Sequence, residues 1–213
     1  MNNIVYSTTL LFGKTIGFLS KIFFPPKLFF LQILLMEGIS TARNKSRFAS
    51  FGKKSRISPK TTLIKPEFVH IGENCHFSSY ITIEATHVAD RLPEIIIGNM
   101  CSFGEFTHIT CANKIEIGDG TLTGRFVLIT DNAHGISSIE EAMKIPLNRK
   151  VYSKGNVSIG ENVWIGDKVT ILPGVKIGKN SIIGANSVVL SDIPSSVVAA
   201  GCPAKIVKHL TSK

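Results

Sequence analysis

The stretch from Ile159 to Pro194 reads IGENVW IGDKVT ILPGVK IGKNSI IGANSV VLSDIP, which is six hexads in succession without a break. Each hexad begins with a large aliphatic residue, and glycine often stands second. The same pattern returns upstream, in hexads that begin at Ile71, Phe77, Ile97, Phe103, Ile117 and Thr123. A period of six that is kept for 36 residues indicates a repeat architecture.

The fifth residue of the hexads is small or β-branched, as at Cys75, Cys101, Thr107, Thr121, Val163, Val169 and Ser181. Side chains alternate between the two faces of a strand, so a hexad that turns a corner can direct one large and one small residue inward. Glycine relieves the backbone at the turn. Three such sides close a coil of about 18 residues, and stacked coils pair their backbones with the coils above and below. The sequence therefore predicts an all-β fold, a parallel β-helix.

Together with Gly201-Cys202-Pro203-Ala204-Lys205, the hexads resemble the hexapeptide-repeat acyltransferases, specifically the maltose, galactoside and polysaccharide O-acetyltransferases. The resemblance covers residues 65 to 208. It implies a left-handed winding, which the general crossover rule would not predict. It also implies a homotrimer, active sites between subunits, acetyl-CoA as acyl donor, and a sugar or glycan as acceptor.

Three segments lie outside the period of the repeat: an N-terminal segment and two interruptions of the hexads. Residues 1–45 are apolar and are broken by Lys14, Lys21 and a double proline. Ser7 and the two lysines recur every seven residues, which predicts a short amphipathic helix. Such a helix can lie peripherally on a membrane surface or pack against the rest of the protein. The β-helix domain is expected at 60–208. Its hexads are interrupted at 80–96 and at about 131–157. Both interruptions are candidate functional segments, because loops that leave a rigid scaffold often carry function.

His134 is the candidate general base. Transfer of an acyl group to a hydroxyl needs a group that accepts the hydroxyl proton, and neutral histidine suits this task. His134 lies where the repeat gives way to the longer interruption, and it follows Gly118 by sixteen residues, as the catalytic histidine does in the sugar O-acetyltransferases. Asp131 either orients His134 or caps a turn with Asn132.

The donor site is assigned through the resemblance. It implies that acetyl-CoA lies against Asp167, whose backbone amide faces the thioester, and against Ala185, Leu190, Ser191, Lys205 and Lys208. The two lysines can meet phosphate charge, and Ala185 leaves room for the pantetheine arm because other hexads carry larger polar residues at that position. Trp164, the single tryptophan, occupies an outward position and is expected to line the acceptor site or a subunit interface.

The acceptor contacts of the galactoside enzymes are absent, because their asparagine and aspartate fall near Gly104 and Ala112. Glu105 is the candidate residue for binding the acceptor in place of that asparagine and aspartate, and His108 is the other candidate. The apolar N-terminal segment instead suggests an acceptor near the membrane, such as a glycan of an O-antigen, capsule or exopolysaccharide under assembly.

Composition excludes other classes of function. The net charge of +9 favours anionic partners, but the basic residues are scattered and not interleaved with aromatics, so nucleic acid is not expected. The four cysteines have no zinc-site spacing and are expected to be reduced, and no metal is expected in the chemistry. Three clustered histidines, as in a carbonic-anhydrase-like relative, are also lacking. Without a secretory signal, the chain is expected in the cytoplasm, with the inner face of the membrane as a peripheral location.

The sequence thus predicts an acetyl-CoA-dependent O-acetyltransferase. Two alternatives stay open: an N-acetyltransferase acting on a nucleotide-linked amino sugar, and a non-catalytic β-helix scaffold.

Overall fold

Three parallel sheets form the body of the molecule in the computed structural model, which describes residues 3–23, 26–88 and 91–211. Face A contains β1 (Ser50–Phe51), β4 (Val69–Ile71), β7 (Glu94–Ile97), β10 (Lys114–Ile117), β15 (Val157–Ile159) and β18 (Lys176–Ile177). Face B contains β2 (Arg56–Ile57), β5 (His76–Phe77), β8 (Ser102–Phe103), β11 (Leu122–Thr123), β16 (Trp164–Ile165), β19 (Ile182–Ile183), β21 (Val197–Gly201) and β22 (Ala204–His209). Face C contains β3 (Thr62–Ile64), β6 (Thr82–Ala85), β9 (His108–Cys111), β12 (Leu128–Thr130), β17 (Thr170–Ile171) and β20 (Val188–Val189).

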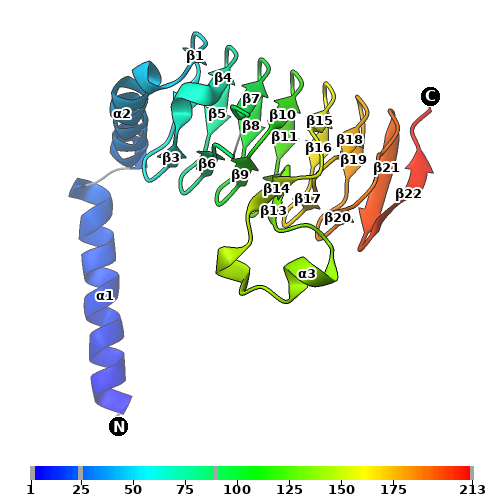
Figure 1. Ribbon diagram of the computed structural model, residues 1–213. Helices are drawn as coiled ribbons and strands as arrows, with labels where there is room; N and C mark the ends of the chain where they lie inside the picture. Colours follow the sequence, from blue (N-terminus) through cyan, green and yellow to red (C-terminus); the bar gives the residue numbers. More distant parts are fainter. Residues whose placement is uncertain (1–2, 24–25, 89–90, 212–213) are drawn as a thin grey trace.

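Each complete coil contributes one strand to each face, so the chain winds into a triangular prism (Figure 1). All neighbouring strands are parallel within the coils, and only β22 turns back antiparallel against β21 at the C-terminal end. The predicted parallel β-helix is therefore confirmed. Its first strand begins at Ser50, ten residues ahead of the expected boundary at residue 60.

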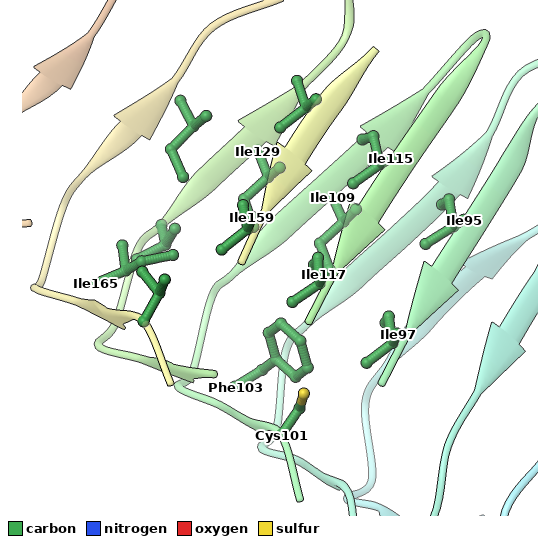
Figure 2. Packing of buried hydrophobic residues seen from close by; sticks show 14 of the residues in the cluster. Ile95, Ile97, Cys101, Phe103, Ile109, Ile115, Ile117, Ile129, Ile159 and Ile165 are labelled. Atoms are coloured by element: carbon green, nitrogen blue, oxygen red, sulfur yellow. The ribbon is translucent and has the colours of Figure 1, made fainter. Parts of the chain in front are cut away.

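The core consists of ladders in which the same hexad position repeats from coil to coil (Figure 2). Ile95 pairs in register with Ile115, which pairs with Val157, and all three side chains are fully buried. The Phe77 and Phe103 rings stack with their centroids 4.9 Å apart. Identical neighbours pack without voids, which is why a strict sequence period gives a dense interior.

Hydroxyl-bearing residues at the fifth hexad position donate hydrogen bonds to backbone carbonyl groups at the corners. The hydroxyl groups of Thr107, Thr121 and Ser187 donate to the carbonyl oxygens of Gly104, Gly118 and Gly184, at 2.8, 2.9 and 2.6 Å. All three hydroxyl-bearing residues are buried. At these three corners, a buried hydroxyl group thus gives the glycine carbonyl a hydrogen-bond donor.

Glycine at the second position allows the coils to stack closely. A Cβ atom placed on Gly118 would lie 2.6 Å from the carbonyl carbon of Gly160 in the next coil. This distance is shorter than any ordinary contact between carbon atoms. The glycine of each hexad is therefore a requirement of the spacing between coils.

Two helices precede the β-helix. The first, α1 (Asn3–Phe23), covers most of the predicted amphipathic segment and ends just before the proline pair. The second, α2 (Pro26–Asn44), was not expected as a separate helix and is followed by the short 3₁₀ turn η1 (Lys45–Arg47). Among the described residues, neither helix is long and apolar enough to cross a membrane.

Polar residues fasten α2 to the first coil, at the end of the prism (Figure 1). The carboxylate of Glu37 is buried and accepts hydrogen bonds from Ser58 Oγ at 2.7 Å and from Arg56 Nη1 at 3.4 Å. The same carboxylate lies 2.9 Å from His76 Nε2. Thr41 Oγ1 accepts a hydrogen bond at 2.9 Å from the backbone amide of Ile57, which belongs to the edge strand β2. The helix therefore closes an open sheet edge.

Burial opposes ionisation of Glu37, but the hydrogen bonds from Ser58 and His76, together with the charges of His76 and Arg56, set its pKa below the ordinary value of 4.5. A depressed pKa in the folded state means that the charged carboxylate stabilises the fold above pH 4.5. That contribution is lost as the pH falls below 4.5 toward the folded-state value.

We expect Glu37→Gln to lower the free energy of unfolding at neutral pH by about 1–3 kcal/mol, since a hydrogen-bonded buried charge is removed. The difference from the wild type should shrink as the pH drops below 4.5. Denaturant titrations at several pH values measure both effects. Glu67→Gln, at an exposed site, is the matched control. Equal stability of the wild type and Glu37→Gln at neutral pH would contradict the role given to Glu37.

Candidate active site

Every departure from the regular coil falls at one corner, where the chain passes from face C to face A; we call it the C/A corner. Strands of the last two complete coils pair with an offset of 18 residues, as in Ile165 with Ile183. The offset is 26 between β6 and β9 and 42 between β12 and β17. It is the same on all three faces of each pair of coils. The extra residues must therefore leave between β6 and β7 and between β12 and β15.

The β12–β15 excursion holds the predicted base. It contains β13 (Asn132–His134), the helical turn α3 (Ile139–Ala142), the 3₁₀ turn η3 (Pro146–Asn148) and β14 (Val151–Ser153). The strands β13 and β14 pair antiparallel and place His134 opposite Val151. Just beyond, the amide of Gly135 donates to the Lys150 carbonyl at 2.8 Å. His134 is therefore exposed on a backbone that is fixed by a strand pair.

Asp131 has a structural position. Its buried carboxylate accepts hydrogen bonds from the backbone amides of Ala112, Asn113 and Lys114, at 2.7, 2.7 and 2.8 Å. It also accepts from Asn132 Nδ2 at 3.1 Å. Of the two roles considered for Asp131, these bonds fit the capping of a turn. They also attach the start of the β12–β15 excursion to the preceding coil. Burial and the negative charge of Asp131 raise the pKa of the neighbouring Cys111 thiol above its usual range.

The two excursions together enclose a cleft of 720 Å³ at the C/A corner. The β6–β7 excursion contributes Thr86, His87 and Val88, and the β12–β15 excursion contributes Gly135, Ile136, Glu141, Lys150, Val151 and Tyr152. A volume of this size lies in the range of small-molecule sites, whose walls are mostly apolar with a few polar groups. The cleft begins at Gly135, next to His134.

Glu141 is a cleft residue that sequence reasoning did not identify. Its Oε1 pairs with Lys144, whereas its Oε2 is shielded from solvent and has no hydrogen-bond partner among the described residues. The segment Ser138-Ile139-Glu140-Glu141 has the form of a capping box, and the Glu141 amide does donate to Ser138 Oγ at 3.2 Å. This pattern could have predicted α3, but not that the carboxylate faces the cleft.

The sequence analysis also did not identify the other polar residues of the cleft, which are Thr86, His87, Lys150 and Tyr152. Each stands in an irregular segment, without a spacing that relates it to His134. Residues 86 and 152 meet only because the register of the coils brings two distant excursions to one corner. No local signal in the sequence contains this information.

The predicted donor residues are divided between two sides of the prism. Leu190 and Ser191 follow β20 and lie at the C/A corner, as the β12–β15 excursion does. Asp167 and Ala185 lie at the corner between faces B and C. Lys205 and Lys208 are on β22, at the end of face B.

The two predicted acceptor residues also lie away from His134. Trp164 is about half exposed on face B, in register with Leu122 and Ile182. Glu105, at the corner between faces B and C, pairs with Arg125 at 3.4 Å. Face B is opposite the C/A corner, so a single chain does not bring Trp164 or Glu105 to the histidine.

The backbone amide of Asp167 lacks the hydrogen-bond acceptor that the equivalent amide of the preceding coil, that of Arg125, has. The Arg125 amide donates to Asp167 Oδ1 at 2.8 Å, so the side chain of one coil caps the turn below. The next coil has Ala185 at this position, and alanine has no acceptor. Within the described part of the chain, the Asp167 amide is therefore left without a hydrogen-bond acceptor.

The described residues contain no group of side chains that could form a metal site. In the ranges 3–23, 26–88 and 91–211, no three His, Cys, Asp or Glu side chains are grouped so that they could hold an ion. Cys75, Cys101 and Cys111 are buried, Cys202 is exposed, and all four are free.

Comparison with known proteins gives matches to transferases. Residues 156–191 match the family model described as bacterial transferase hexapeptide (six repeats). The putative lipopolysaccharide biosynthesis O-acetyl transferase WbbJ of Escherichia coli K12 is 38% identical over 117 residues, which are 54% of this chain and 60% of that protein. The chain thus spans less than two thirds of the length of WbbJ. The galactoside O-acetyltransferase of the same organism is 30% identical over 169 residues, 79% of this chain and 68% of the enzyme.

A solved structure supports the fold. AntD, an N-acyltransferase from Bacillus cereus crystallised with dTDP and 3-hydroxybutyryl-CoA, has a TM-score of 0.68 at 21% identity. The match covers 81% of this chain and 88% of AntD. At this identity the likeness establishes architecture alone, and it confirms the left-handed parallel β-helix. Fold, repeat and aligned relatives agree, and the chain belongs to the hexapeptide-repeat acyltransferase family.

Proposed function

We propose that the protein is an O-acetyltransferase that moves the acetyl group of acetyl-CoA to a hydroxyl group of a surface-polysaccharide sugar, with His134 as general base. The observation that carries this proposal is the position of His134. It is exposed on the β13–β14 strand pair and adjoins the 720 Å³ cleft at the corner where the solenoid departs from its period.

In the proposed reaction, neutral His134 accepts the proton of the acceptor hydroxyl as its oxygen attacks the thioester carbonyl. A carbon–oxygen bond forms, and the carbonyl oxygen becomes an oxyanion. When the intermediate collapses, the carbon–sulfur bond breaks and the coenzyme A sulfur leaves with the proton from His134. The products are the acetyl ester and free coenzyme A, and the histidine is neutral again.

Stabilisation of the oxyanion is assigned to the Asp167 amide. Preorganised backbone N–H groups are effective donors to a developing negative charge. This amide is available because Ala185, in the next coil, provides no acceptor. The small Ala185 side chain would also leave space for the pantetheine arm, and we assign contacts with the phosphates to Lys205 and Lys208, which lie on β22.

The proposed enzyme is a homotrimer with its active sites between subunits. His134 and Asp167 lie on different sides of one prism, so the base and the oxyanion donor can meet only across an interface. In the trimer that we propose, the C/A corner of one subunit would face the neighbouring subunit's face B and its corner between faces B and C. Trp164 of that neighbour would then form a wall of the site, as its exposure on face B allows.

For the acceptor, we propose a glycan of an O-antigen, capsule or exopolysaccharide, modified in the cytoplasm at the inner face of the membrane. The apolar cleft wall of Val88, Ile136 and Val151, with His87 and Lys150 beside it, suits an acceptor that joins a sugar to an apolar or anionic carrier. The similarity to WbbJ, named as a putative lipopolysaccharide biosynthesis O-acetyl transferase, supports this class of acceptor.

An N-acetyltransferase acting on a nucleotide-linked amino sugar is the second candidate. The fold likeness to AntD, whose crystals contain dTDP, favours it. A non-catalytic scaffold is disfavoured, because a scaffold needs neither the cleft nor a histidine beside it.

We expect His134→Ala to lower kcat by about 10²–10⁴-fold, since proton transfer loses its base. Acetyl-CoA binding, measured by calorimetry, should be unchanged. His70→Ala, at a histidine on the outer side of face A, is the matched control and should keep wild-type turnover. Near wild-type acetyl transfer by His134→Ala would refute the mechanism, and failure of the wild type to bind acetyl-CoA would support the scaffold.

A complementation experiment tests where the active site lies. His134→Ala removes the base, and Ala185→Trp blocks the donor groove with a bulky side chain at an exposed position. If the sites lie between subunits, co-expression of the two inactive variants should restore about a quarter of wild-type activity, because random trimers pair intact halves. If each site lies within one chain, the mixture stays as inactive as the separate variants.

The chemistry of the product separates the two candidate reactions. We expect the surface glycan of cells that contain the protein to carry an acetyl group that mild alkali removes, because esters hydrolyse under these conditions and amides do not. Mass spectrometry before and after alkali, with cells that lack the protein as control, measures the difference. An alkali-resistant acetyl group that depends on this protein would identify an N-acetyltransferase.

A further inference from the structure

The helix α2 is bonded to the β-helix through polar groups and exposes most of its large apolar side chains. In a soluble protein, a surface helix turns its apolar side to the core and its polar side to solvent. The hydrogen bonds that join α2 to the β-helix come from polar residues: Glu37 binds Ser58, and Thr41 binds the amide of Ile57. Ser40 Oγ adds a hydrogen bond of 3.3 Å to the Ser58 carbonyl.

The large apolar side chains of α2 are exposed. Eight large side chains are more than one third accessible: Leu28, Phe30, Leu31, Ile33, Leu34, Leu35, Met36 and Ile39. The described part of α1 adds Leu10, Leu11, Phe12, Ile16 and Phe18, which are exposed to a similar degree. We call these thirteen residues the apolar surface. Soluble proteins rarely expose so many large apolar side chains at one end without a partner.

The charge of the chain is concentrated at the same end. Residues 1–66 contain 11 of the 24 lysine and arginine residues and one of the 15 acidic residues, Glu37. The remaining residues contain 13 basic and 14 acidic side chains, which nearly cancel. Since Glu37 is buried against the first coil and partnered, the end that carries the apolar surface has a strong excess of positive charge. The occupant of this surface should therefore be apolar and anionic.

We propose that the apolar surface of α1 and α2 docks on an anionic phospholipid bilayer and holds the β-helix at the membrane by its N-terminal end. A phospholipid leaflet offers acyl chains to the apolar side chains and negative headgroups to the lysines and arginines around them. Neither described helix can cross the bilayer, so both lie within the interface. A second copy of this basic surface would instead face like charge.

The polar side of α2 couples this docking to the catalytic body. Glu37 and Thr41 fix the helix to β2, so the bilayer holds the first coil rather than a free tail. The excursion that contains β13, β14 and α3 leaves a later coil of the prism, away from the end that α2 covers (Figure 1). This inference is independent of the chemistry proposed for His134.

Co-sedimentation of the full-length protein with vesicles tests the proposal. We expect the wild type to pellet with vesicles of phosphatidylcholine and phosphatidylglycerol, and to pellet less with phosphatidylcholine alone or at high salt. Leu35→Asp places a charge in the apolar surface and should weaken binding at least about tenfold. Leu147→Asp makes the same change at an exposed leucine of the β12–β15 excursion and should bind as the wild type does.

Three outcomes would overturn the proposal: no pelleting of the wild type with anionic vesicles, equal binding by Leu35→Asp, or equal weakening by Leu147→Asp. Oligomeric mass, measured by analytical ultracentrifugation, tests the rival occupant. If the wild type does not pellet with vesicles and Leu35→Asp lowers the mass of the oligomer, a second copy of the chain covers the apolar surface. Circular dichroism of each variant checks that the β-helix is intact.

Discussion

Backbone hydrogen bonds between successive coils run along all three faces of the prism, and the rest of the structure depends on them. Because each coil is bonded to the next on every face, all three faces must keep the same offset between coils. An inserted segment cannot be absorbed within a strand without breaking the ladders. It has to leave at a corner, and in this chain all insertions leave at the C/A corner. The position of the cleft is a direct consequence of this register.

The same ladders explain the selection of residue types inside the coil. Isoleucine rungs such as Ile97 and Ile117 repeat at the spacing of the backbone, so each side chain packs on its own kind. At one corner, the Thr121 hydroxyl donates a hydrogen bond to the Gly118 carbonyl. Asp167 caps the Arg125 amide, whereas Ala185 in the next coil has no side-chain acceptor, and the Asp167 amide is left free for another acceptor. The proposed oxyanion donor is thus an amide that the coil itself does not cap.

The two ends of the prism have different surroundings. At the C-terminal end, β22 folds back on β21, and the exposed edge is closed by the chain itself. At the N-terminal end, α2 closes the edge through polar contacts, and this leaves its apolar side outward. A helix that met the coil through its apolar side would have left Ile57 without an acceptor. The polar contact and the exposed apolar side are therefore two consequences of one arrangement.

The hexad period, the burial of its first and fifth residues and the amphipathic character of α1 could all be predicted from the sequence, because each is a local pattern that the backbone geometry repeats. The spacing from Gly118 also selected His134. The tertiary structure alone decided that Asp131 binds the turn at Ala112, that His87 and Tyr152 line one cleft, and that Glu37 turns the polar side of α2 inward. These contacts join residues about 20 to 65 positions apart in the chain. Their meeting depends on the register of the coils and on the lengths of the excursions, which no local pattern records.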